Sequence, residues 1–417
     1  MLDRTQAPPI YRIQDLSLPE IEDYDLPNGR KLYVHHERNT EAFKVELVTN
    51  GGNIDSPNAA FVQLGMKMLN EGTKQKNSST LSSTIDGLGS FLEISPGFDS
   101  SSIAIYGLKK FYLENIRLLS EIIYESGFDP KTLDKLKSKQ LNKYKLNLQK
   151  SSYISSIGLR AELFKGHPYG YTLNEKQIAD TDIADLKQHW RKNIQSFDIY
   201  ISGDLPDDFK QIILDQFVKI QKSQTSEFTI VNSGKKKLDH RTPKFIQSSI
   251  KAGKTLFNRH HPDYFQFIVM NELFGGFFGS RLMKNIREDK GYTYGIYSSL
   301  LAMNHAGYFL ISTDVKKDFE SNTIEEIKRE ILELQNALVS KEELQIVKNY
   351  MLGSFVNSFS SPFAAISKFK LVNNQGLELP YYQKYLKQVP QVTAEQIQGM
   401  AQKYLELNSL TWSIAGS

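Results

Sequence analysis

The chain contains 417 residues, of which 40% are apolar, 24% charged and 11% aromatic, a composition typical of a folded protein with two or more domains. Lys and Arg exceed Asp and Glu by 51 − 47 = 4, and because the basic residues form no arginine-rich block, the charge does not indicate nucleic-acid binding. The sequence has no cysteine, which excludes disulfides, thiolate catalysis and cysteine-ligated zinc.

The N-terminal 30 residues are rich in charge and contain no apolar run of signal-peptide length. No segment of the sequence approaches the roughly 18 consecutive apolar residues of a membrane span. We therefore expect a soluble protein without a membrane span, located by default in the cytoplasm.

Hydrophobic periodicity and turn residues predict the elements of the first half in chain order. Strands are expected near 30–36, 43–50, 90–95, 101–107 and 197–202, and helices near 57–71, 79–88, 110–126, 130–149, 152–164 and 182–193. Residues 221–245 are polar and lack sustained periodicity. We interpret them as the linker between an N-terminal domain, residues 1–220, and a C-terminal domain, residues 246–417.

The chain also contains an internal duplication at about half its length. Leu and Lys residues of segment 129–141 recur in segment 340–352, and a Ser-Ser pair follows each segment. Both segments have the periodicity of long amphipathic helices. The repeat and the segregation of strands from helices predict an α+β fold of two homologous two-layer domains. Each would have a mainly antiparallel sheet with helices on one face, and together they would form a clamshell.

Ordinary catalytic and metal-binding motifs are missing from the sequence. The eight histidines form no H-x-x-E-H, H-E-x-x-H or H-x-x-x-H pattern, so no pair of them is spaced to hold zinc from one helix face. No G-x-S-x-G, P-loop or G-x-G-x-x-G is present either. The absence of these motifs, taken alone, would predict a chain without an active site.

Three segments spread over most of the chain match one known pattern. They are FVQLGMKMLNEGT at 61–73, FKGHPYG at 164–170, and GGFFGSRLMKNIREDKGYTYGIYSS at 275–299. They resemble the zinc helix with its Gly-Thr exit, the HPYG segment and the second-domain signature of the pitrilysin/insulinase metallopeptidase family. Each piece alone is weakly specific, but the combination is strong. The length and the duplication resemble the family's small two-domain branch, which includes processing-peptidase subunits.

The resemblance also implies that the zinc motif is degenerate here. Aligned on the Gly-Thr exit, the family's two histidines and glutamate fall on Gln63, Lys67 and Met66. A charged ammonium cannot ligate a metal, and a thioether cannot act as the general base. Asp134 is the nearest candidate for the family's downstream acidic ligand; it either pairs with Lys67 or is a solvated surface charge. We expect no metal and no cofactor in this chain.

The substrate-binding half of the family's site is retained. The family holds its substrate with an arginine and a tyrosine seven residues apart, which correspond to Arg287 and Tyr294. Both side chains can donate hydrogen bonds to a peptide carbonyl or to the oxyanion formed on it. Tyr292 is the main competitor for Tyr294, and Arg281 is expected to support the helix or a domain contact instead. Without the resemblance, Arg287 and Tyr294 would be interpreted as a helix-terminal charge and a packed strand residue.

The resemblance therefore implies the non-catalytic subunit of a heteromeric zinc metallopeptidase. A homologous partner subunit with H-x-x-E-H would carry the zinc, and this chain would supply Arg287 and Tyr294 to hold a peptide or an unfolded polypeptide. The alternative is a structural assembly subunit of the same fold with no peptidase role, in which these two residues are dispensable. An active peptidase with unusual ligands is disfavoured because the sequence has no suitable histidine pair.

Overall fold

The computed structural model describes residues 18–38, 40–49, 51–56, 58–220 and 236–417. Its strands are β1 (Glu22–Leu26), β2 (Arg30–His36), β3 (Ala42–Thr49), β4 (Phe91–Ser95), β5 (Ser101–Leu108), β6 (Phe197–Gly203), β7 (Lys237–Arg241), β8 (Ser248–Leu256), β9 (Thr293–Ala302), β10 (Gly307–Val315) and β11 (Thr411–Gly416). Its α-helices are α1 (Ala59–Met68), α2 (Ser78–Gly87), α3 (Tyr112–Tyr124), α4 (Pro130–Asn147), α5 (Ser151–Leu163), α6 (Glu175–Ala179), α7 (Ile183–His189), α8 (Phe209–Gln216), α9 (Tyr264–Asn271), α10 (Glu320–Asn336), α11 (Lys341–Asn357), α12 (Pro362–Asn373), α13 (Pro380–Gln388) and α14 (Ala394–Tyr404).

Every strand and helix predicted for the first half is present, and the structure adds β1, α6 and α8, which were not predicted. The predicted linker is partly wrong, because β7 lies inside it and pairs in parallel with β11. This strand reads Lys-Leu-Asp-His-Arg and is largely exposed at the sheet edge, so it lacks the apolar alternation that marks a half-buried strand. Residues 221–235 of the predicted linker lie outside the described residues. No helix within the described ranges is both long and apolar enough to cross a lipid bilayer.

Two mixed sheets with the same central topology form the framework. The first has the strand order β1-β2-β6-β3-β5-β4 and the second β7-β11-β8-β10-β9. In each half the last strand lies beside an early strand and runs parallel to it, which gives the pairs β2–β6 and β7–β11. The other strand pairs are antiparallel. This shared order is what the sequence duplication predicts, and the α+β class with two mainly antiparallel sheets is confirmed.

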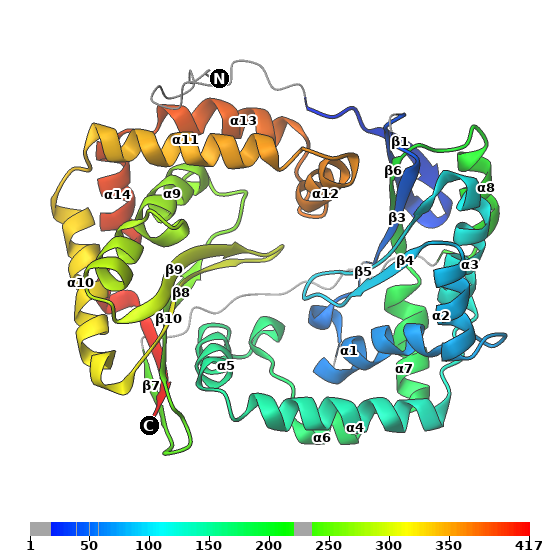
Figure 1. Cartoon of the computed structure of the whole chain (residues 1–417), viewed down its shortest axis with the longest axis horizontal. Helices are drawn as coiled ribbons and strands as arrows, with labels where there is room; N and C mark the ends of the chain where they lie inside the picture. The colour runs from blue at the N-terminus through cyan, green and yellow to red at the C-terminus, as the bar shows by residue number, and fades with distance from the viewer. Residues whose placement is uncertain (1–17, 39, 50, 57, 221–235) are drawn as a thin grey trace, which may run out of the picture.

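Each half covers one face of its sheet with its own helices and the opposite face with a helix from the other half (Figure 1). Helix α5 packs on β8 and β11 of the second sheet, and α12 packs on β6 and β2 of the first. Figure 1 shows how the long helices α4 and α11 lead the chain across to these positions. The expectation of helices on one face only is therefore incomplete, because periodicity reveals that a helix has a buried face but not which sheet buries it.

Strand β3 shows the effect of this exchange of helices α5 and α12 between the halves, because it is buried on both faces. Phe43, Val45 and Leu47 point into the core beneath the first half's own helices. The alternate residue Val48 faces the other side and packs against Ile366 of α12. Successive side chains of a strand point to opposite faces of the sheet, so β3 is buried on both faces only because α12 is present.

A buried charged triad also joins α12 to the first sheet. Glu46 of β3 is 3% exposed and its carboxylate accepts hydrogen bonds from Lys44 Nζ at 2.7 Å and from Lys370 Nζ at 2.5 Å. Burial alone would raise the pKa of the Glu46 carboxyl, but the charges of Lys370 and Lys44 hold this pKa below its ordinary value. Because Lys370 belongs to α12, the buried carboxylate is fully paired only while the two halves are docked.

We expect Ile366→Ala to lower the free energy of unfolding by about 2–4 kcal/mol, since it removes a fully buried side chain from the α12 contact. Leu371→Ala is the matched control on the same helix, and because Leu371 is 41% exposed the change should be within about 0.5 kcal/mol. Urea denaturation of the full chain measures both values. Equal losses in the two variants would contradict the burial of α12 on the first sheet.

Candidate functional site

Local backbone signals fix the ends of the segment that corresponds to a zinc helix. Helix α1 begins after Asn58, whose side chain accepts a hydrogen bond from Ala60 N at 2.8 Å and so acts as the N-cap. The exit is at Gly72, with φ +122°, and a Cβ there would lie 2.5 Å from Lys76 O. Only glycine fits this conformation, which gives the Gly-Thr exit in the sequence its physical reason.

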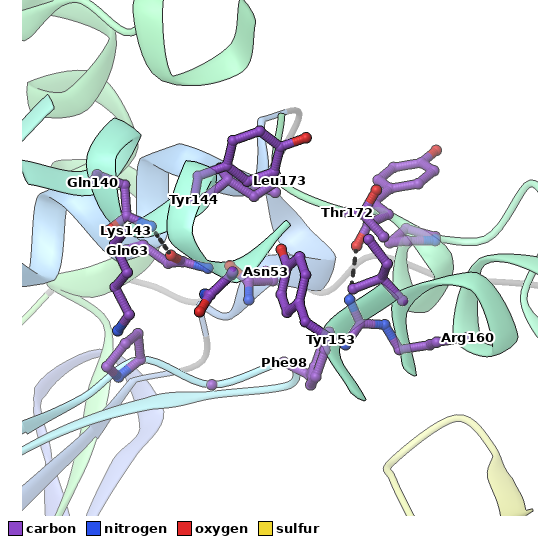
Figure 2. Close-up of a pocket in the computed structure, with 17 residues that line it drawn as sticks. Asn53, Gln63, Phe98, Gln140, Lys143, Tyr144, Tyr153, Arg160, Thr172 and Leu173 are labelled. Carbon is purple, nitrogen blue, oxygen red and sulfur yellow. Dashed lines mark hydrogen bonds between the residues drawn. The ribbon is translucent and has the colours of Figure 1, made fainter. Parts of the chain in front are cut away.

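The zinc-ligand positions of α1 are occupied by a hydrogen-bonded chain that includes Gln140 of α4. Lys67 Nζ donates to Gln140 Oε1. Gln140 Nε2 in turn donates to Gln63 Oε1 at 3.0 Å, a bond that Figure 2 shows. An ammonium group has only donors, so it fixes the orientation of the Gln140 amide, which then presents its nitrogen to Gln63. Gln140 is 5% exposed, and the three side chains satisfy one another where a metal would otherwise be held.

Asp134 does not take part in this site. It lies on α4 six residues before Gln140 and is exposed, and within the described ranges no ion pair joins it to Lys67. Of the two alternatives left open by the sequence, the solvated charge is therefore correct. Sequence reasoning missed Gln140 because it searched for an acidic third ligand, and a neutral amide gives no such signal.

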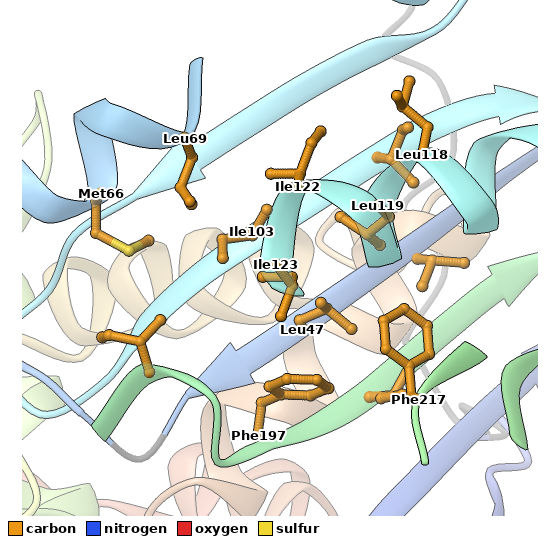
Figure 3. Close-up of a cluster of buried hydrophobic side chains, with 14 of the residues drawn as sticks. Leu47, Met66, Leu69, Ile103, Leu118, Leu119, Ile122, Ile123, Phe197 and Phe217 are labelled. Atoms are coloured by element: carbon orange, nitrogen blue, oxygen red, sulfur yellow. The ribbon is translucent and has the colours of Figure 1, made fainter. Parts of the chain in front are cut away.

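Met66 points away from the site. It is 1% exposed and packs in the hydrophobic core of the first half, together with Leu69 and Ile103 (Figure 3). Two amides and an ammonium remain, and this donor set does not fit zinc, which takes imidazole, thiolate or carboxylate ligands. In the part of the chain that the structure describes, no group of three or more His, Asp or Glu residues is arranged to hold a metal ion.

The predicted substrate-binding pair lies in the second half. Arg287 is in the π-helical segment Met283–Asp289, half-buried, with its guanidinium 4.4 Å from the centre of the Phe278 ring. Tyr294 is near the start of β9, the edge strand of the second sheet, and is 95% exposed. Among the described residues no hydrogen bond or ring contact joins Arg287 to Tyr294. The structure thus places both side chains without bringing them together.

The two neighbouring candidates have structural partners. Tyr292 stacks on Phe319 at a ring-centre distance of 4.7 Å, so its ring is used in packing. Arg281 forms two hydrogen bonds of 2.8 Å with the carboxylate of Glu343 on α11, a bidentate geometry that ties two elements together. These contacts support the choice of Tyr294 over Tyr292 and a supporting role for Arg281.

The second half has a pocket at the place that corresponds to the degenerate site. It has a volume of about 320 Å³ and is lined from α9, α11, α12 and α13. Counted from the residues before α1 and α9, Asn58 and Asp263, the equivalent of Lys67 is Glu272, because 67 − 58 = 272 − 263 = 9. Burial raises the pKa of Glu272 to about 7. The two halves therefore carry opposite kinds of side chain at this shared position.

Comparison with known proteins shows which proteins this chain is similar to. Residues 182–351 match the family model described as Peptidase M16 inactive domain. The chain is 24% identical over 393 residues to the "Non-peptidase homolog YmxG" of Helicobacter pylori, covering 88% of this chain and 87% of that protein. This chain is therefore similar to M16 proteins over most of its length. The resemblance to the pitrilysin/insulinase peptidases is thereby confirmed.

Two further comparisons agree with this similarity. The "Uncharacterized zinc protease YmxG" of Bacillus subtilis is 21% identical over 363 residues, covering 84% of this chain and 87% of the relative. The crystal structure of a peptidase M16 inactive domain from Pseudomonas fluorescens has the same fold, with a TM-score of 0.87 at 23% identity, covering 95% of this chain and 98% of that one. The chain thus resembles M16 proteins that are described as inactive or as non-peptidase homologues, and its own zinc-helix positions are degenerate.

Rebuilding the metal site should require Gln140, not Asp134. We expect a Gln63→His, Lys67→His, Gln140→Glu variant to bind one zinc ion at least about 10-fold more tightly than the matched Gln63→His, Lys67→His variant, because it gains a carboxylate ligand at the position observed next to both. Met66 stays unchanged, since a carboxylate there would be buried in the core. Calorimetric titration measures both affinities, and equal affinities would show that Gln140 does not face the site.

The raised pKa of Glu272 predicts that the free energy of unfolding decreases as pH rises. The unfolded carboxyl loses its proton near its ordinary value of 4.5 and the folded one near 7, so the folded state binds more protons in this window and stability falls as pH rises through it. Glu272→Gln should leave stability unchanged at pH 4.5 and raise it by up to about 3 kcal/mol at pH 8. Urea denaturation at both pH values checks this, with exposed Glu342→Gln as control. A gain at pH 8 that is no larger than at pH 4.5 would contradict the shift.

Proposed function

We propose that this chain is the non-catalytic subunit of a heteromeric zinc peptidase in the cytoplasm. A homologous M16 subunit with H-x-x-E-H would carry the zinc and the general base. This chain would contribute Arg287 and Tyr294 to hold an extended peptide or an unfolded polypeptide segment. The proposal accounts for a chain that lacks the metal ligands and yet retains the substrate-binding pair.

The exposure of Tyr294 is the observation that carries the proposal. At 95% exposed, the ring has almost no packing value to the folded chain, and no hydrogen bond to its hydroxyl is found in the described ranges. An aromatic residue with an apolar ring and a polar tip is well suited to contact another molecule. Its hydroxyl is available to donate to a substrate carbonyl.

The guanidinium of Arg287 is also available to bind a substrate. Its contact is with the ring of Phe278, which is itself 62% exposed, and within the described residues no carboxylate forms an ion pair with it. A guanidinium that is positioned by a ring, with its donors unpaired, can bind the oxygen on which negative charge develops during attack on a peptide bond.

The strand that carries Tyr294 supports an extended ligand. Strand β9 is the edge of the second sheet, and Tyr297 and Leu301, at 55% and 37%, are exposed along it. An edge strand with unpaired backbone groups can add one more strand from a bound peptide. Apolar side chains along that edge would then contact the added strand.

We expect Tyr294→Phe and Arg287→Ala each to lower peptide cleavage by the reconstituted two-subunit complex by about 100- to 1000-fold, the range typical for loss of an oxyanion donor. Tyr297→Phe, a hydroxyl deletion on the same strand, is the matched control and should retain nearly full turnover. Sedimentation velocity and melting temperature should show that all variants fold and assemble normally.

The outcome for Tyr294→Phe decides between the two candidate roles. This variant keeps the ring and removes only the hydroxyl, so a strong loss of turnover in an intact complex points to transition-state binding. Wild-type turnover in both Tyr294→Phe and Arg287→Ala would reject the proposal. The chain would then be a structural assembly subunit.

A further inference from the structure

A basic pocket lies beside the degenerate zinc site. It has a volume of about 370 Å³ and is lined from α1, α4 and α5, from the turn before β5, and from residues 168–173 (Figure 2). Lys143 of α4 and Arg160 of α5 are the charged residues in its lining, and none of the described residues that line it is acidic. This size is within the range of pockets that bind small ligands.

Arg160 lacks an anionic partner in this pocket. Its guanidinium lies 4.9 Å from the centre of the Phe98 ring, and one terminal nitrogen donates to Tyr171 O at 3.3 Å. Its Nε is buried without an acceptor, and no carboxylate in the described ranges pairs with it. Burial accordingly lowers the pKa of Arg160. The second terminal nitrogen, Nη1, is not among the buried atoms and has no hydrogen-bond acceptor in the described ranges, so a bound anion could pair with it.

Lys143 adds a second unpaired cation. In the part of the chain that the structure describes, no acidic side chain forms an ion pair with it. Burial, and then the charge on Lys143, lower the pKa of the neighbouring Lys67, which is the effect of like charges held close together. Positive charge thus accumulates here without a counter-charge from the chain.

Other lysines of α4 differ from Lys143 in their contacts. Lys145 forms an ion pair with Glu175 at 3.7 Å, and Lys137 donates to Thr181 O at 2.8 Å. Lys139 and Lys143 are both exposed, but only Lys143 lines the pocket. Lys143 instead lines a pocket with tyrosine and amide side chains, which are the neutral donors that accompany cations in anion sites.

We propose that the basic pocket binds a small ligand through its oxyanion groups, either carboxylate or phosphate. Figure 2 shows Lys143 and Arg160 on different sides of the pocket, with Asn53 and Tyr153 between them. This placement favours a ligand with more than one oxyanion group, one near each cation. The Arg160 fork can bind two oxygens of one group, and Lys143 acts as a point charge. This chain alone forms the pocket, so the proposal does not depend on a partner subunit.

The test is calorimetric titration of the full chain at low salt with two probes, the peptide triglutamate and inorganic pyrophosphate, and with triglutamine as the neutral control. We expect saturable 1:1 binding of at least one anionic probe and none of triglutamine. Binding of triglutamate alone would identify a carboxylate ligand, and binding of pyrophosphate alone a phosphate ligand. Binding of both would show that the pocket accepts either oxyanion.

Variants locate the binding. Lys143→Gln and Arg160→Gln should each weaken it at least about 10-fold, the effect of losing one charged hydrogen bond, while Lys139→Gln should bind like the wild type. If Arg160→Gln fails to fold, Arg160→Lys and Lys143→Gln decide the matter. The proposal is overturned if neither anionic probe binds up to millimolar concentration, if the pocket variants bind like the wild type, or if triglutamine binds as well as triglutamate.

Discussion

The exchange of one helix between the halves is the constraint on which the rest of this structure depends. Helix α12 covers Val48 and Tyr200 of the first sheet, and α5 covers the second sheet. Without this exchange each sheet would expose an apolar face, and the carboxylate of Glu46 would lose Lys370. The exchange also brings α5, with Arg160, against α1 and α4, so that elements of both the degenerate site and the interface line one pocket.

A polar cluster occupies the positions that correspond to the family's zinc ligands. Lys67, Gln140 and Gln63 form one chain of donors and acceptors, so a change at one position leaves a partner unsatisfied. Met66 belongs to the packing of the core and not to the site. The adjoining pocket is also positively charged, because it is lined by Lys143 and Arg160 and by no acidic residue among those described. Where a zinc peptidase holds a cation, the proposed ligand of this neighbouring pocket is an anion.

Much of the fold could be predicted from the sequence because its elements have strong local signals. Periodicity identified the helices of the first half, and the repeat between α4 and α11 predicted two homologous halves. Strand β7 could not be found, since an exposed edge strand of charged residues has no apolar alternation. The roles of Gln140 and Arg160 depend on contacts between distant segments, and neither residue type marks a site by its spacing. Arg287 and Tyr294 were found by family resemblance, and their role stays a prediction.

The helix exchange also bears on how the chain is synthesised. When the first half has left the ribosome, α12 has not yet been made, and the sheet face that carries Val48 and Tyr200 has nothing to cover it. Helix α5 is complete by then, but its apolar side chains have no second sheet to pack on. Both surfaces stay exposed until α12, which ends at Asn373, has emerged. Newly made chains therefore pass through a long interval with exposed apolar surface and a strong requirement for protection from aggregation.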